Sequence, residues 1–222
     1  MCDFKAEVSQ RLEDKVIWMA ELQEDVVAKG LGGLEALISR AGGKEKGLPP
    51  VDKWNPEFCG DIPMEIRADG TWFYMGTPIG RHALVKLFSS VLRKDDDGKT
   101  YLVTPVERVG ITVEDSHFLI VEMNAHEKND QQVITCRTNM DDVFEIGPDH
   151  PMHFVTVDGN EGVKPYVNVR GRLEGLFVRS AMYELIAHGE EIDVDGVLMF
   201  AVRSNGVTFP IMPADELAQR SA

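Results

Sequence analysis

The sequence predicts an α+β fold with two similar strand-rich units, each with one long helix, after an N-terminal helical extension. Three observations favour this fold. A helical apolar periodicity runs through residues 4–29. Asp-Gly dipeptides flanked by β-forming residues predict hairpins. These dipeptides also recur in the same order around two helical patterns, which indicates an internal duplication.

The N-terminal extension shows one apolar stripe, with charged residues between its members. The stripe consists of Val8, Leu12, Val16, Met19, Leu22 and Val26. Spacings of three and four residues predict an amphipathic helix over residues 4–29. Glycines at positions 30, 32 and 33 end it, and a shorter helical pattern spans residues 34–38. Two roles remain open: a helix packed on its own domain, or a helix that dimerises or binds a partner.

Four dipeptides mark the expected hairpin turns, because both central positions of a two-residue turn need positive φ. They are Asp69-Gly70, Asp97-Gly98, Asp158-Gly159 and Asp195-Gly196. The first pair brackets a strand at residues 72–75 and a helix with Leu84, Leu87, Phe88 and Val91 on one face. The second pair brackets a strand at residues 166–169 and a helix with Leu176, Phe177, Met182, Leu185 and Ile186.

The two units also end alike, because residues 106–113 and 202–209 share Val, Gly, an aliphatic residue and Thr in that order. The sequence therefore predicts a repeated strand–strand–helix–strand–strand unit. The predicted boundaries are residues 1–32 for the extension, 33–114 for the first repeat, 115–213 for acidic strands with the second repeat, and 214–222 for a C-terminal tail.

Composition narrows the class of protein. The chain has 222 residues, of which 43% are hydrophobic, so a sizeable core is expected. No run is long enough for a membrane span, and the N-terminus lacks a signal-peptide pattern. The three cysteines, Cys2, Cys59 and Cys136, lie far apart and predict neither a disulfide framework nor a zinc site. We therefore expect a cytoplasmic protein without a membrane partner.

Charge argues against general nucleic-acid binding, because the formal net charge is −14. The acidity is uneven. Residues 111–165 carry 3 basic and 11 acidic side chains, whereas residues 51–110 carry 8 basic and 9 acidic ones. A small anionic ligand is therefore not excluded near the nearly neutral segment from Trp72 to Arg81.

The stretch "GTWFYMGTPIGRHALVKLF" combines a strand, a glycine turn and a helix start that carries Arg81. It matches neither a Walker loop nor a dinucleotide fingerprint, so a structural connection is the default interpretation. The repeat gives it a counterpart in "YVNVRGRLEGLF", which we predict to place Gly171-Arg172 at the start of the second helix.

If the repeats pack face to face, basic and aromatic residues from both can converge on one cleft that suits a nucleotide. These residues are Arg81, Lys164, Arg170, Arg172, Trp72, Tyr74 and Tyr166. The alternative is that the arginines pair with local acids such as Glu107 and Glu174, and that the aromatic residues belong to the core. Both interpretations remain open.

Catalytic patterns are weak. The sequence has no nucleophile elbow and no His-Glu-x-x-His motif. A proline separates His150 from His153, which argues against a metal pair, and Asp141-Asp142 is expected to be a solvated turn. Cys59 would be redox-active only with a cation beside it. We predict no catalytic residue, no metal and no cofactor, and the question of an enzyme stays open.

Several strings resemble an uncharacterised bacterial family catalogued as domain of unknown function 1285. They are "LPPVDKWNPEFCGDIPMEIRADGTWFYMGTPIGRHALVKLFSSVLR", "YLVTPVE" and "KPYVNVRGRLEGLFVRSAMYEL", within a resemblance that runs from Leu34 to Pro213. The resemblance implies a duplicated α+β core, a second half superficially like pleckstrin-homology folds, and a nucleotide-type ligand between the halves. It also implies a role in signalling, with a proposed link to oxidative stress.

The positions that carry this resemblance into a predicted ligand site are Lys53, Trp54, Asn55, Trp72, Tyr74, Arg81, Lys164, Tyr166, Arg170 and Arg172. The helix predicted over residues 4–29 lies outside the resemblance. We therefore expect a ligand-binding signalling module. The alternatives are an enzyme acting on a nucleotide-like substrate, and an interaction protein that forms a homo-oligomer or binds a protein partner through residues 4–29.

Overall fold

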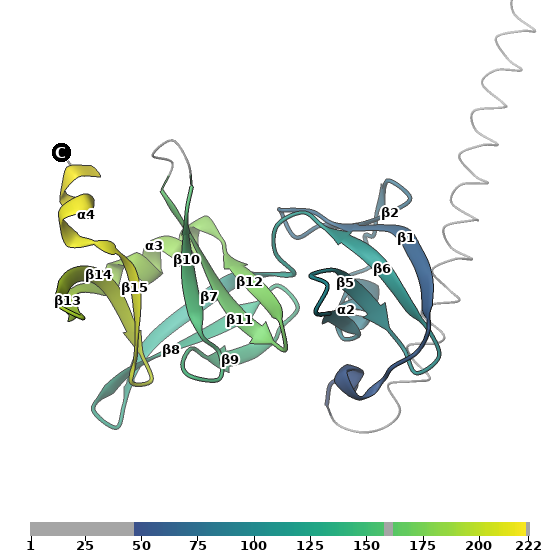
Figure 1. The fold of residues 1–222 in the computed structure, drawn as a ribbon, viewed down its shortest axis with the longest axis horizontal. Coiled ribbons are helices and arrows are strands. Elements are labelled where there is room, and N and C mark those ends of the chain that lie inside the picture. Colours follow the sequence, from purple (N-terminus) through teal and green to yellow (C-terminus); the bar gives the residue numbers. More distant parts are fainter. Residues whose placement is uncertain (1–46, 158–161, 221–222) are drawn as a thin grey trace, which may run out of the picture.

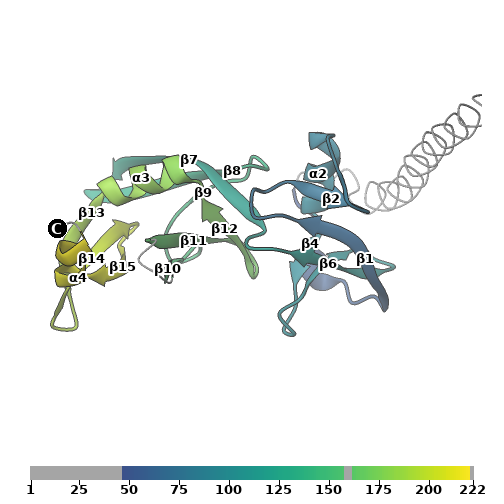
Figure 2. The ribbon, with the colours of Figure 1, turned by 90° about the horizontal axis from the view of Figure 1, so that it is seen from above.

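A computed structural model describes residues 47–157 and 162–220, which form three β-sheets in a row with short helices beside them (Figures 1 and 2). Two of the sheets have six strands and the third, at the C-terminal end, has three. The strand-rich prediction is therefore confirmed. The helices predicted over residues 4–29 and 34–38 and the predicted turn at Asp158-Gly159 lie outside the described residues.

The N-terminal unit holds the first sheet. Its elements are η1 (Val51–Lys53), β1 (Phe58–Ile66), β2 (Trp72–Tyr74), β3 (Thr77–Pro78), α2 (His82–Ser89), β4 (Leu92–Lys94), β5 (Thr100–Val103) and β6 (Arg108–Val113). The strand order is β3-β2-β1-β6-β5-β4. β1 and β6 pair in parallel, and every other pair of neighbours in this sheet is antiparallel.

The glycine-containing stretch of residues 70–88 forms turns rather than a phosphate loop. Met75 (φ 50°) and Gly76 (φ 75°) form the two-residue connection between β2 and β3, where both φ angles are positive. Gly70 (φ 77°) closes the turn between β1 and β2 and donates its N–H to the carbonyl of Arg67 at 2.8 Å. Arg81 is the N-cap residue of α2, with an extended backbone.

The C-terminal unit holds the other two sheets. Its elements are β7 (Phe118–Lys128), β8 (Gln131–Thr138), β9 (Val143–Glu145), β10 (Met152–Thr156), β11 (Val163–Arg170), β12 (Leu173–Phe177), α3 (Arg179–Ala187), β13 (Gly189–Val194), β14 (Val197–Ser204), β15 (Val207–Pro213) and α4 (Ala214–Arg220). The second sheet has the order β10-β11-β12-β7-β8-β9, and the third has the order β13-β14-β15. β12 and β7, far apart in the sequence, pair in parallel.

One sequence prediction is wrong here, because Leu176 and Phe177 belong to strand β12 and α3 begins only at Arg179. Burial alternates along β12, as it does in a strand with one covered face. Gly171, with φ at 52°, lies in the hairpin turn between β11 and β12. Arg172 therefore follows a turn glycine and has no helix N-terminus behind it. The helices α2 and α3 have only 8 and 9 residues, so the expectation of one long helix per unit is also wrong.

The order of elements is nevertheless the same in the two predicted repeats. Three strands, a helix and three strands follow one another both in β1–β6 with α2 and in β10–β15 with α3. The sheets differ, because the first set forms one sheet, whereas in the second set β10–β12 join β7–β9 through the β12–β7 pair and β13–β15 form a sheet of their own. Whether residues 62–113 superpose on residues 152–211 stays a prediction.

The two units share one hydrophobic core at their junction. Trp72 and Phe88 of the N-terminal unit belong to the same buried cluster as Phe118, Met140 and Leu173 of the C-terminal unit. A second cluster joins the second sheet to α3 and the third sheet. Apolar side chains from both units are buried together in this core. The core therefore holds the two units against each other, and no ligand is needed for this.

Candidate functional site

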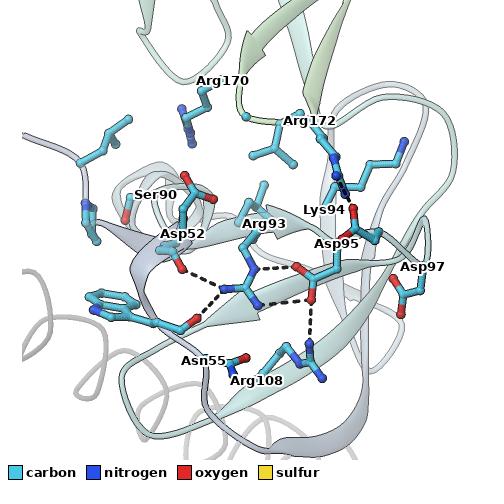
Figure 3. A pocket seen from close by; sticks show the side chains of 18 residues that line it. Asp52, Asn55, Ser90, Arg93, Lys94, Asp95, Asp97, Arg108, Arg170 and Arg172 are labelled. Carbon is cyan, nitrogen blue, oxygen red and sulfur yellow. Dashed lines mark hydrogen bonds and ion pairs between the residues drawn. The ribbon is translucent and has the colours of Figure 1, made fainter.

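A cleft of about 820 Å³ lies between the N-terminal unit and the β11–β12 turn (Figure 3). One wall comes from residues 48–55, which include η1, and from β4 with the turn that follows it. The other wall comes from residues 170–173. Because small-molecule sites of comparable volume commonly lie between domains, this cleft is the candidate ligand site.

Arg170 holds the two walls together. Its Nη2 donates to the carbonyl oxygen of Ser89 at 2.7 Å, and its Nη1 donates to Oδ2 of Asp142 at 3.0 Å. The guanidinium carbon also lies 4.7 Å from the centre of the Phe118 ring. Ser89 is the last residue of α2, where a cation interacts favourably with the helix dipole. Arg170 is therefore a structural residue of the junction.

The floor of the cleft is a network of two arginines around Asp95 (Figure 3). Arg93 donates to Asp95 through Nε at 2.6 Å and through Nη2 at 3.2 Å, and Nη1 of Arg108 donates to Asp95 at 2.7 Å. Nη1 of Arg93 also donates to the carbonyls of Val51 and Trp54, at 2.9 and 2.7 Å. Arg93 therefore anchors η1 and Trp54 onto β4.

This network gives a test that uses two neighbouring aspartates. Asp95→Ala should lower the free energy of unfolding by about 1–3 kcal/mol, because it leaves two partly buried guanidinium groups without their carboxylate. Asp96→Ala should cost less than about 0.5 kcal/mol, because the Asp96 side chain is 89% exposed. Urea unfolding of both variants measures this difference, and equal losses would contradict the assigned role of Asp95.

The remaining cations of the cleft are more accessible. Arg172 forms an ion pair with Asp96, but both side chains are largely exposed, so the pair contributes little and a ligand anion can replace it. Lys94 makes no ion pair with any residue that the structure describes. The lining has five cationic and four acidic side chains, a net charge of +1 in a chain of net charge −14.

Comparison with known proteins gives a family match for each of the two units. Residues 49–116 match the family model "Domain of unknown function (DUF1285), N-terminal domain". Residues 117–211 match "Protein of unknown function (DUF1285), C-terminal domain". The chain belongs to the DUF1285 family. The family resemblance predicted from the sequence is thus confirmed, and the border between the two family domains falls at the junction beneath the cleft.

Solved structures of DUF1285 family proteins are similar to this chain. One, from Silicibacter pomeroyi DSS-3, is 42% identical, with a TM-score of 0.73, and the match covers 82% of this chain and 97% of that one. Another, from Shewanella baltica OS155, is 26% identical with a TM-score of 0.45, and the match covers 57% of this chain and 91% of that one. The comparison with curated proteins gave no match.

Four of the ten site residues predicted for this DUF1285 family member line the cleft. They are Trp54, Asn55, Arg170 and Arg172. Lys53 is exposed on η1, and neither it nor Arg81 is among the residues that line the cleft. The two arginines of the second unit pair with Asp142 and Asp96, so the alternative of local acidic partners holds for them, although the partners are not Glu107 and Glu174.

The predicted aromatic platform does not form around the cleft. Trp72 is only 1% exposed and stacks on Phe88 with ring centroids 6.4 Å apart, so it is a core residue, and Tyr74 packs partly against the same core. Nζ of Lys164 and the hydroxyl of Tyr166 both donate to Asp115, at 2.7 and 2.6 Å, outside the cleft. The expected convergence of the seven basic and aromatic residues on one cleft is therefore wrong, because only Arg170 and Arg172 of them line it.

The Asp115 cluster is better explained as a structural one. Burial opposes the charge of Asp115, but hydrogen bonds from Lys164 and Tyr166 outweigh burial and lower the pKa of its carboxyl group. Burial and the bond to Asp115 raise the pKa of the Tyr166 hydroxyl. Lys164 and Tyr166 therefore hold β11 against the segment that joins the units.

Sequence reasoning missed Arg93, Lys94 and Arg108. The signal was present as the run of residues 93–97, in which two basic residues precede three aspartates, but that run was interpreted only as a hairpin turn. Antiparallel strand pairing brings the two arginines together, because Arg93 on β4 pairs with Tyr101 and Arg108 on β6 pairs with Val103, both on β5. The two arginines thus lie on the two strands that flank β5 and reach the same carboxylate.

Other chemistry-bearing residues lie elsewhere. Cys59 is exposed, and its thiol lies 3.6 Å from the carbonyl oxygen of Glu57. Nδ1 of His150 lies 3.0 Å from the carbonyl oxygen of Asn168, and His153 stacks on Tyr166. In the described part of the chain, no group of three or more His, Cys, Asp or Glu is placed to hold a metal ion. No helix there is long and apolar enough to span a membrane.

Proposed function

We propose that this DUF1285 family member is a ligand-binding signalling module that holds a nucleotide-type anion in the cleft between its two units. The observation that carries the proposal is the gathering of five cationic side chains from both units around one cleft of about 820 Å³. In a chain of net charge −14, a phosphate group would be repelled from most of the surface, so a locally cationic cleft is its favoured location.

The residues of the cleft suggest how such a ligand would bind. Its phosphate would take the place of Asp96 on Arg172 and would accept hydrogen bonds from Lys94, which has no carboxylate partner among the described residues. Trp54, positioned by Arg93, offers an aromatic face for a base. Asp52 can accept hydrogen bonds from ribose hydroxyls, as acidic residues do in dinucleotide sites.

The expected affinity is modest. Two charge-assisted hydrogen bonds contribute about 1.5–3 kcal/mol each, and stacking on Trp54 adds about 1–3 kcal/mol. Displacing Asp96 and ordering the ligand offset part of this gain. A dissociation constant in the micromolar to millimolar range follows, which suits a protein that responds to changing ligand concentration.

Titration calorimetry with ADP and, separately, with pyrophosphate tests the proposal. ADP should bind, and Arg172→Ala should weaken it at least about tenfold, because one charged contact is lost. Lys53→Ala is the matched control, since Lys53 is exposed on η1 outside the cleft, and it should leave the affinity unchanged.

Pyrophosphate should bind more weakly than ADP if Trp54 stacks on the base. Absence of ADP binding, or equal losses in the Arg172 and Lys53 variants, would contradict the proposed site.

The proposal retains two finer expectations about the fold. These are the internal duplication and the superficial likeness of the second half to pleckstrin-homology folds. The shared order of elements around α2 and α3 supports the duplication. A superposition of residues 62–113 on residues 152–211 tests it, and unrelated positions of the two helices on their strands would contradict it.

A further inference from the structure

A second, largely apolar groove lies in the C-terminal unit, away from the cleft. Strands β11 and β12, helices α3 and α4 and strands β14 and β15 border it, and its volume is about 640 Å³. Apolar side chains that line it include Leu176, Met182, Ile186, Phe200 and Met212. An apolar hollow of this kind on a surface commonly marks an interaction site.

The charge around this groove has one sign. Its two charged lining residues are Lys164 and Arg179, and no acidic residue lines it. Lys164 is paired with Asp115, but the guanidinium of Arg179 donates to the hydroxyl of Tyr183 at 3.0 and 3.2 Å, lies over the Tyr183 ring, and makes no ion pair within the described residues. Tyr183 itself is 56% exposed. The groove is therefore complementary to an apolar element with acidic residues beside it.

The sequence predicts such an element outside the described residues. The sequence of residues 4–29 predicts an amphipathic helix with six apolar residues in one stripe. That segment carries six acidic and four basic side chains, so its net charge is −2. From Val8 to Val26 the stripe would extend about 27 Å along a helix, and amphipathic helices bind apolar grooves through such stripes.

The position of the groove favours a second copy of the chain as the partner. The described chain starts in the N-terminal unit, whereas α3, α4 and β15 lie at the opposite end of the molecule (Figures 1 and 2). Residues 30–46 join the segment to this start, and five of these 17 residues are glycine. Even as a fully flexible coil, a sequence of that length would have a mean reach of only about 20–25 Å, and the helical pattern predicted over residues 34–38 would shorten it.

We propose that residues 4–29 of one copy dock into the apolar groove of a second copy, and that the exchange is reciprocal. A symmetric dimer of this kind satisfies both apolar surfaces with two identical contacts. The proposal is independent of the nucleotide cleft, because the groove and the cleft share no residue.

Light scattering after size exclusion of the full chain tests the proposal. The native protein should have the mass of a dimer. Leu12→Glu in the segment and Met182→Glu in the groove should each give a monomer, since a buried charge in either partner opposes docking. Leu198→Glu is the matched control, because Leu198 is 50% exposed outside the groove, and it should remain a dimer.

Mixing distinguishes exchange between copies from the alternatives. The Leu12→Glu chain keeps an intact groove and the Met182→Glu chain keeps an intact segment, so the mixture should recover a dimer held by one contact. A mixture that stays monomeric would overturn the proposal. A monomeric native protein, as expected if the segment docks in its own chain or an apolar small molecule fills the groove, would also overturn it.

A dimer that survives Met182→Glu would overturn it too, because it would mean that two segments pair with each other. Tyr183→Glu provides a second groove variant at an exposed position, in case Met182→Glu fails to fold. Circular dichroism melting curves establish that each variant is folded.

Discussion

Replacing Trp72 with alanine should lower the free energy of unfolding by about 3–5 kcal/mol, the largest effect we expect from a single substitution in this chain. The side chain is 1% exposed, stacks on Phe88, and belongs to the core that the two units share. Removing it would leave a cavity at the junction beneath the cleft, which the surrounding strands can fill only in part.

Trp54 is the matched comparison, because it lies at the cleft and is only partly buried. Trp54→Ala should cost about 1 kcal/mol or less in stability but should weaken ADP binding, whereas Trp72→Phe should keep most of the stability. Nε1 of Trp72 has no hydrogen-bond partner in the described part of the chain, so phenylalanine would break no bond there.

Urea unfolding with calorimetric titration of the same variants separates the two roles. A Trp72→Ala protein as stable as the native one would contradict the shared core.

Stability should fall by about 3 kcal/mol as the pH is lowered from about 6.5 to about 4, because of His117 at the junction. Burial, with the positive charges of Lys94 and Arg170 nearby, lowers the pKa of His117 from 6.5 to about 4. Between these values the unfolded chain binds a proton that the folded chain does not. The contribution is therefore complete above pH 6.5 and is lost as the pH falls towards 4.

The bonds of His117 explain why the neutral form is required. The backbone N–H of Glu174 donates to its Nδ1 at 3.2 Å, so Nδ1 is the acceptor. Its Nε2 then carries the proton and faces the hydroxyl of Thr100 at 3.0 Å. His117 thus connects β5 of one unit to β12 of the other, and a second proton on the ring would break the bond from Glu174.

Urea midpoints of the native protein and of His117→Gln, measured between pH 7 and pH 4.5, test this assignment. The variant should be less stable at pH 7 but should lose less stability on acidification, so the two curves should converge. His126→Gln is the control at an exposed position and should follow the native curve. Parallel profiles for the native protein and the His117 variant would show that another group is responsible.

Local features of this fold followed from the sequence, because their causes are local. Asp195 and Gly196 form the predicted hairpin turn, with φ at 54° and 84°, since few residues other than these adopt positive φ at low cost. Turns also form at Gly70 and Gly98, but there the prediction of two-residue turns is wrong: only the glycine of each Asp-Gly pair has positive φ, and the loops are longer than two residues. The helix around Leu84 and Phe88 has the same kind of local origin as the turn at Gly196. The family was also predictable, because long stretches of this sequence resemble the DUF1285 family.

The pairing of distant elements was decided only by the tertiary structure. An apolar run such as Leu173–Phe177 suits a helix or a strand, and its parallel pairing with β7, some 55 residues earlier, makes it a strand. Because Leu173–Phe177 is a strand, Arg172 lies in a hairpin turn and not at the predicted helix start. This hairpin turn lies at the cleft.

The same reason explains the outcome for the site residues. Trp72 and Trp54 have the same side chain, but the shared core buries the first, and the Arg93 network leaves the second at the cleft. Residue type and spacing therefore determined which cationic and aromatic groups this protein has. Only the packing of the two units against each other determined which of these groups meet, because long-range strand pairing and core burial place side chains that no local pattern relates.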